Sequence, residues 1–267
     1  MALVERLCIT QQDVAVELKL VFPDAGQPRA ALLYFHGGGF AYASLHTHER
    51  LMRRLALASG AVVVGVDYRR TPEHPYPAAL NDALAAWQWL RAGGDGRFGG
   101  IPMGAAGDSA GANLALALAI RLRGAGENMP DTLGLAYGMY DRVMNSGSHE
   151  RYGDGRYGLS TARLEWFWNQ YLARDVHAVD PCAVPALADV SGLPPVVAFI
   201  AERDCLADDT YALVKMLEAA GVAHSVDIFE NMTHGAIQLG ALVPAADAAL
   251  DLIGKRLAAR LMSGAAI

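Results

Sequence analysis

The sequence predicts an α/β fold in which a mostly parallel sheet is flanked by helices. Short, continuous apolar runs recur along the chain, and such runs are typical of strands buried on both faces of a parallel sheet. Segments with helical spacing of apolar residues separate these runs, which indicates repeated βα units. The chain has 267 residues and is 53% hydrophobic, enough to bury one large core. We therefore expect one domain spanning residues 1–267.

The individual elements follow from the same patterns. The strand-like runs are residues 14–22, 30–35, 61–66, 101–106, 133–140, 195–201 and 223–229. The helical segments are residues 48–59, 78–90, 110–123, 208–220 and 245–261. A turn is predicted at residues 23–26, which read Pro-Asp-Ala-Gly. In such a fold the reactive residues are expected at the carboxyl ends of the strands.

Residues 141–189 interrupt the alternation of strand and helix. Aromatic side chains gather there within short helical stretches: Tyr152, Tyr157, Trp166, Phe167, Trp168 and Tyr171. We interpret this segment as a small cap-like insertion that covers the active site. Its aromatic residues serve either ordinary packing or the wall of a substrate pocket.

Charge and cysteine usage exclude several classes of protein. The formal net charge is −6 without any stretch rich in lysine and arginine, which disfavours a nucleic-acid or anionic-membrane partner. Neither a signal-peptide pattern at the amino terminus nor a run of 18 apolar residues is present, so we expect a cytoplasmic protein. The cysteines, Cys8, Cys182 and Cys205, are odd in number and widely spaced, which favours reduced thiols over disulfides or a zinc site. Neither a metal nor a cofactor is expected, and a homo-oligomer is left open.

Two glycine-rich motifs carry the chemistry. Residues 36–40 read His-Gly-Gly-Gly-Phe and residues 107–111 read Gly-Asp-Ser-Ala-Gly, each directly after a predicted strand. The second motif fits a nucleophile elbow, in which a strand turns sharply into a helix and only small residues fit beside the exposed serine. The two motifs together predict Ser109 as a nucleophile and, at residues 36–40, donors for the oxyanion that it creates.

A serine hydroxyl needs an imidazole to take its proton and a carboxylate to orient that imidazole. In this architecture the chain order is nucleophile, acid, histidine. Asp204 lies just beyond the predicted strand 195–201, whereas Asp208 and Asp209 are explained as charges that cap the next helix. Of the two histidines that follow, His224 begins a strand and His234 lies in a loop after it. We predict Asp204 as the acid and His234 as the base.

The oxyanion donors are expected to be backbone amides. The amide of Ala110 follows the nucleophile and lies at a helix start, where the helix dipole favours an anion. Gly37 and Gly38 are predicted as the other donors, because a residue without Cβ lets its N–H approach the substrate closely. Gly39 and His36 are expected to shape the loop.

With these motifs the chain resembles the hormone-sensitive-lipase-like carboxylesterases, also called bacterial family IV, of the α/β-hydrolase superfamily. The resemblance rests on residues 36–40, 67–79, 107–115, 204–208 and 234–235, and the Gly-Asp-Ser-Ala-Gly sequence is that of one subgroup. It implies an α/β-hydrolase fold with a small insertion or cap after the sixth strand, and the same triad and oxyanion donors. Only 35 residues precede His36, which predicts a shortened amino-terminal cap, and Cys205 stands where the family usually has proline.

The predicted function is therefore hydrolysis of small carboxylic esters through an acyl-enzyme, without a cofactor. An amidase or formamidase acting on small arylamides would use the same groups and is the first alternative. A non-catalytic ligand-binding module is less favoured, because such modules generally lose the histidine that this chain keeps.

Overall fold

The computed structural model describes residues 3–11, 14–23 and 28–263. Within these residues, eight strands form one sheet in the order β1-β2-β4-β3-β5-β6-β7-β8. The strands are β1 (Val4–Gln11), β2 (Val14–Val21), β3 (Ala31–Phe35), β4 (Val62–Asp67), β5 (Met103–Asp108), β6 (Leu133–Ala136), β7 (Val196–Arg203) and β8 (His224–Thr233). β2 runs antiparallel to β1 and β4, and the other neighbouring pairs are parallel. The predicted mostly parallel sheet is confirmed.

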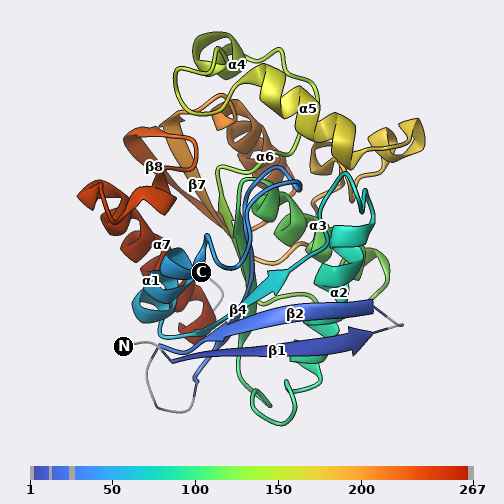
Figure 1. The fold of residues 1–267 in the computed structure, drawn as a ribbon, viewed down its shortest axis with the longest axis vertical. Coiled ribbons are helices and arrows are strands. Elements are labelled where there is room, and N and C mark those ends of the chain that lie inside the picture. The colour runs from blue at the N-terminus through green and yellow to red at the C-terminus, as the bar shows by residue number, and fades with distance from the viewer. Residues whose placement is uncertain (1–2, 12–13, 24–27, 264–267) are drawn as a thin grey trace.

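Helices cover both faces of this sheet (Figure 1). They are α1 (Glu49–Ser59), α2 (Ala78–Arg91), α3 (Ala110–Gly124), α4 (Gly147–Tyr152), α5 (Thr161–Tyr171), α6 (Ala207–Ala219) and α7 (Pro244–Ser263), with 3-10 turns η1 (Asp175–Val179), η2 (Pro185–Leu187) and η3 (Ala236–Leu239). Successive residues of a strand point to opposite faces, and β3 shows the result. Leu33 and Phe35 join the core formed with α2, α3 and α6, while Leu32 and Tyr34 join the core formed with α1 and α7.

The largest differences from the sequence prediction are at three strands. β1 was not predicted, because it is an edge strand whose polar residues face solvent and interrupt its apolar pattern. The strand expected at 133–140 ends at Ala136, since Tyr137 has a φ of 37° that turns the chain out of the sheet. β8 continues four residues beyond the expected 229, to Thr233. The turn expected at 23–26 lies mostly outside the described residues.

The topology brings distant segments to one edge of the sheet. β3, β5, β6, β7 and β8 are parallel, so their carboxyl ends lie side by side. The segment between β6 and β7 carries α4 and α5, which lie above this edge at the top of Figure 1. The loops that follow β3, β5, β7 and β8 therefore meet beneath α4 and α5.

Candidate active site

Ser109 lies in a sharp turn between β5 and α3. Its φ of 54° and ψ of −119° are unusual for a residue with a side chain and are typical of a nucleophile elbow. The turn needs the flanking glycines because backbone approaches backbone there. A Cβ on Gly107 would lie 2.3 Å from the carbonyl carbon of Gly111, and a Cβ on Gly111 would lie 1.9 Å from the carbonyl oxygen of Phe35. The glycines thus allow α3 to start against β3 with Ser109 projecting between them.

The structure brings Ser109, His234 and Asp204 together in one chain of hydrogen bonds. The Ser109 hydroxyl donates to His234 Nε2 over 2.9 Å, and His234 Nδ1 donates to Asp204 Oδ2 over 2.6 Å. Asp204 follows β7 and is 1% exposed, and its other oxygen accepts the Leu206 amide over 2.9 Å. Burial lowers the pKa of His234, but the charge of Asp204 and its hydrogen bond outweigh burial and raise the pKa above its ordinary value. The carboxylate therefore makes the imidazole a stronger base and keeps Nε2 directed at the serine.

The turn that follows Asp204 is attached to α4. The Ser148 hydroxyl donates to the Cys205 carbonyl over 2.7 Å, and the Ser148 amide donates to Asp208 over 2.8 Å. Cys205 is itself buried, and burial raises the pKa of its thiol, as expected for a packed and unreactive cysteine. The insertion thus supports the backbone that carries Asp204.

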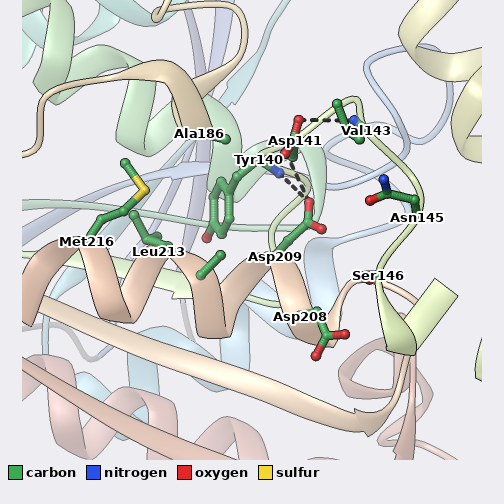
Figure 2. A pocket seen from close by; sticks show the side chains of 11 residues that line it. Tyr140, Asp141, Val143, Asn145, Ser146, Ala186, Asp208, Asp209, Leu213 and Met216 are labelled. Atoms are coloured by element: carbon green, nitrogen blue, oxygen red, sulfur yellow. Dashed lines mark hydrogen bonds between the residues drawn. The ribbon is translucent and has the colours of Figure 1, made fainter.

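Asp208 and Asp209 begin α6 as predicted, but their carboxylates do not cap it. One oxygen of Asp209 accepts the amides of Tyr140 and Asp141 over 3.0 and 3.1 Å (Figure 2). Burial raises the pKa of Asp209 to about 7, against the opposing effect of these two amides. A cavity of about 120 Å³ lies beside this group. The two aspartates therefore lie in the first turn of α6 as predicted, and in addition they accept hydrogen bonds from the segment that leaves β6.

The oxyanion loop departs from the prediction at Gly37. Its amide donates to Asp108 Oδ1 over 2.9 Å, so this N–H is already bonded and does not serve as an oxyanion donor. The backbone amides of Gly38, Gly39 and Ala110 donate no hydrogen bond to any group in the described part of the chain. Gly38 and Gly39 also line the cavity that contains Ser109. The sequence analysis chose Gly37 as a donor and assigned Gly39 to shaping the loop, and no local signal distinguishes three consecutive glycines.

Asp108 connects the elbow to the oxyanion loop. It is 1% exposed and accepts hydrogen bonds from the Tyr34 hydroxyl over 2.6 Å and from the Gly37 amide. Gln238 Nε2 lies 3.3 Å from the other oxygen, and His48 Nε2 lies 3.6 Å from Oδ1. Burial raises the pKa of Asp108, but His48, Tyr34 and the Gly37 amide outweigh it and hold the pKa below its ordinary range. This buried carboxylate is therefore ionised and fixes Gly37 beside the nucleophile.

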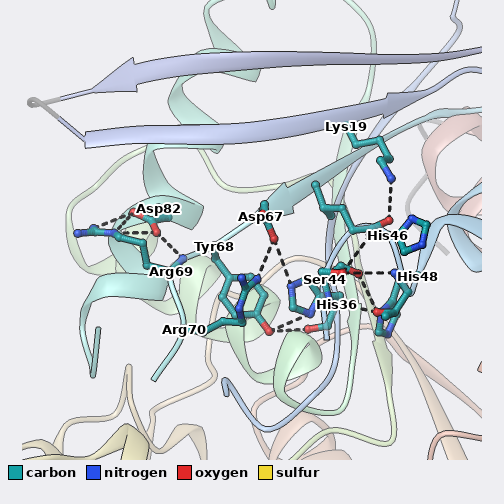
Figure 3. A network of polar contacts seen from close by, with 12 residues as sticks. Lys19, His36, Ser44, His46, His48, Asp67, Tyr68, Arg69, Arg70 and Asp82 are labelled. Atoms are coloured by element: carbon teal, nitrogen blue, oxygen red, sulfur yellow. Dashed lines mark hydrogen bonds and ion pairs between the residues drawn. The ribbon is translucent and has the colours of Figure 1, made fainter. Parts of the chain in front are cut away.

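His36 shapes the start of the same loop, as predicted (Figure 3). Its Nδ1 donates to the Gly37 carbonyl over 2.7 Å, and its ring stacks on Tyr68 with centroids 4.4 Å apart. Burial lowers the pKa of His36 to about 4, so the ring is neutral near pH 7. The Tyr68 hydroxyl donates to the His36 carbonyl over 2.7 Å, and Arg70 forms an ion pair with Asp67 over 2.9 Å. His36 has a structural role in holding the glycine loop.

A cavity of about 310 Å³ opens over Ser109 and His234. Its other lining residues are Gly38, Gly39, Tyr42, Asp108, Gly158, Leu159, Arg163, Leu164, Phe167, Gly235 and Gln238. The ring of Phe167 on α5 presses on the oxyanion loop, since a Cβ on Gly39 would lie 2.3 Å from it. Tyr171 on the same helix stacks on Phe40 with centroids 3.7 Å apart. The aromatic residues of the insertion thus divide into a packing group, which includes Tyr171, and a lining group, represented by Phe167.

Neither a metal site nor a membrane-spanning helix is found in the described ranges. No group of three or more histidine, cysteine, aspartate or glutamate side chains there could hold a metal ion. No helix among the same residues is long and apolar enough to cross a membrane.

Sheet topology, elbow and triad geometry together define an α/β-hydrolase. A family model described as alpha/beta hydrolase fold matches residues 32–238, and the chain belongs to this family. It is 35% identical over 252 residues to a Pseudomonas putida protein named ethyl acetate hydrolase, covering 91% of this chain and 78% of that protein. It is 34% identical over 236 residues to a carboxylesterase of Mycobacterium tuberculosis, covering 85% of this chain and 72% of that protein.

Solved structures agree with the sequence relatives. A thermostable esterase from Pseudomonas putida superposes with a TM-score of 0.93 at 32% identity, covering 97% of this chain and 83% of that chain. An esterase from the archaeon Pyrobaculum calidifontis superposes with a TM-score of 0.91 at 33% identity, covering 96% and 85%. The resemblance to the hormone-sensitive-lipase-like carboxylesterases is confirmed at the level of the family. The subgroup and the shortened amino-terminal cap stay predictions.

Proposed function

We propose that this protein is a serine carboxylesterase that hydrolyses small carboxylic esters. The observation that carries the proposal is the continuous hydrogen-bond chain from Ser109 through His234 to Asp204. Relatives with names such as ethyl acetate hydrolase and carboxylesterase favour an ester over the amide of the alternative amidase or formamidase. The cavity of about 310 Å³ is at the lower end of the ~300–1,000 Å³ range of ligand pockets, which suits short acyl and alcohol groups.

The first half of the reaction forms an acyl-enzyme. His234 Nε2 takes the proton from Ser109 as Oγ attacks the ester carbonyl carbon, and Asp204 stabilises the imidazolium that results. The amides of Gly38, Gly39 and Ala110 donate to the oxyanion, and removal of one such donor typically costs about 3 kcal/mol of transition-state stabilisation. His234 then returns the proton to the departing alkoxide, which leaves as the alcohol.

The second half releases the acid. Water attacks the acyl carbon, gives a proton to His234, and the tetrahedral intermediate collapses to the carboxylic acid as Ser109 regains its proton. Every step uses side chains and amides of this chain. A module that only binds ligands has no need of a histidine held 2.9 Å from the serine hydroxyl, which argues against that alternative.

The segment 141–189 acts in this proposal as a cap-like insertion of a single α/β-hydrolase domain. α5 supplies Phe167, Leu164 and Arg163 to the cavity wall, and α4 supports the turn after Asp204 through Ser148. Access to Ser109 is therefore governed by the insertion. The cytoplasmic location and a homo-oligomer stay predictions, to be tested by cell fractionation and by sedimentation.

The test compares the wild-type protein with Ser109→Ala on p-nitrophenyl esters of increasing acyl length and on an aryl formamide. We expect the variant to lose at least about 10³-fold in kcat on esters, since its nucleophile is gone. An unchanged rate in Ser109→Ala contradicts the mechanism. Amide turnover above ester turnover in the wild type would reverse the choice between esterase and amidase.

A further inference from the structure

Among the described residues that line the catalytic cavity, Arg163 is the only arginine or lysine. It belongs to the first turn of α5, the helix that lies above the carboxyl edge of the sheet in Figure 1. Its guanidinium carbon lies 6.0 Å from the centroid of the Tyr42 ring, and Tyr42 lines the same cavity. A cation over an aromatic face is held there by the ring quadrupole without losing its donors. The wall of the cavity thus presents a positioned guanidinium.

This guanidinium has no counter-ion in the described part of the chain. Neither a hydrogen bond nor an ion pair within the described residues uses the Arg163 side chain, whereas Arg54 and Arg256 each meet a carboxylate within 3.0 Å. On α5 the residues three and four positions after Arg163 are Trp166 and Phe167, and the residues three and four positions before it, Ser160 and Leu159, precede the helix. None of these four residues is acidic. The five donors of the guanidinium are free to bind an anion that enters the cavity.

A side chain of the opposite charge also lines the cavity. Asp108 lines the cavity next to Ser109, is ionised, and is surrounded by its own donors. The donors around Asp108 already use its oxygens, so the Arg163 guanidinium is left to attract an anionic group of a substrate. Leu159, Leu164 and Phe167 line the same cavity and offer apolar contacts for the hydrocarbon part of such a substrate.

We propose that the substrates of this cavity are esters that carry a carboxylate remote from the scissile bond, and that Arg163 is the specificity-determining residue that binds it. The proposal rests on the esterase function given above. The planar guanidinium matches a carboxylate in a bidentate pair, which a lysine at this position could not reproduce. The carboxylate belongs to the acyl part or to the alcohol part of the ester, and the two cases need separate substrates.

The experiment uses two matched substrate pairs and follows acid release in a pH-stat. Monoethyl adipate against ethyl hexanoate tests a carboxylate on the acyl part, and 4-acetoxybenzoate against 4-methylphenyl acetate tests it on the alcohol part. Arg163→Gln removes the charge, Arg163→Lys keeps the charge without the fork, and Arg142→Gln is the matched control. Arg142 is exposed and does not line the cavity, so its variant changes net charge alone.

Arg163 is exposed, so we expect Arg163→Gln to lower kcat/KM for at least one carboxylate ester by about three- to fivefold, as for an ion pair at the surface. The lower kcat/KM should result from a higher KM with kcat unchanged, because a group remote from the scissile bond is bound equally in the ground state and the transition state. The kcat/KM of Arg163→Gln for the neutral esters should differ from that of the wild type by less than about twofold. The kcat/KM of Arg163→Lys for the carboxylate ester should lie between those of the wild type and Arg163→Gln, and added salt should reduce the difference between wild type and Arg163→Gln. Arg142→Gln should leave both pairs unchanged.

Equal effects of Arg163→Gln on charged and neutral esters, or no effect on either carboxylate ester, would overturn the proposal. Loss of the same size in Arg142→Gln would overturn it as well, since net charge would then explain the result. Failure of the esterase function itself is separate: it would show as no turnover of the neutral esters by the wild type, or as equal turnover by Ser109→Ala.

Discussion

The close contact between the start of α3 and the end of β3 gives a sharp test of the structure. In Gly111→Ala the new Cβ would lie 1.9 Å from the Phe35 carbonyl oxygen and 2.8 Å from the His36 carbonyl oxygen. Ordinary contact begins at 3.4 Å, so the helix start and the strand end must separate by about 1.5 Å. Both neighbours are backbone, which cannot move aside as a flexible side chain would. Overpacking of this kind costs about 1–3 kcal/mol of stability.

The same separation moves the oxyanion loop away from the nucleophile. The loop begins at His36, and a misplacement of about 1 Å at a catalytic site can lower the rate about 100-fold. We therefore expect Gly111→Ala to lower kcat on a short p-nitrophenyl ester about 100-fold and to lower the free energy of unfolding in urea by about 2 kcal/mol.

The matched control is Gly124→Ala at the other end of the same helix. A Cβ there meets nothing within 4 Å, so this substitution should leave kcat unchanged and raise stability by at most about 1 kcal/mol. If Gly111→Ala has a kcat within about threefold of the wild-type value and the same free energy of unfolding as the wild type, α3 and β3 do not approach each other as closely as described.

Two further predictions concern protons. His234 must be neutral to accept the serine proton, and Asp204 raises the pKa of His234 above its ordinary value of 6.5. The acid limb of kcat/KM should therefore lie above pH 6.5 and move to lower pH in Asp204→Asn, in which kcat should also fall by roughly 10⁴-fold. An acid limb that does not move in this variant would contradict the ion pair between His234 and Asp204. The second prediction concerns the stability of the fold. The pKa of Asp209 is about 7 in the folded state, so folding favours its protonated form. Ionisation of Asp209 should therefore lower the free energy of unfolding by up to about 4 kcal/mol as the pH rises from 4 to 7. In urea unfolding, the stability of Asp209→Asn relative to the wild type should therefore increase as the pH rises from 4 to 7. A difference in stability that stays constant with pH would mean that Asp209 is in contact with water.

Much of the fold follows from local pattern. The buried parallel strands appear in the sequence as continuous apolar runs, because both faces of each strand are covered by helices. β1 was missed for the opposite reason, since an edge strand has no continuous run to reveal it. The strand expected to reach residue 140 ends at Ala136 because Tyr137 adopts a positive φ, and no propensity of tyrosine predicts that conformation.

The active site also has features that the local sequence predicts and features that it does not. The sequence alone predicted the nucleophile, the acid and the base from chain order and strand ends, and the structure joins Ser109, His234 and Asp204 by hydrogen bonds. Only the tertiary structure decided which glycine amides face the cavity. Asp108 comes from β5 and bonds the Gly37 amide across the sheet edge, a contact between residues far apart in the chain that no local pattern encodes. The position of Arg163 over Tyr42 has the same origin, because packing of α5 on the glycine loop, and not the helix sequence, turns that guanidinium toward the substrate cavity.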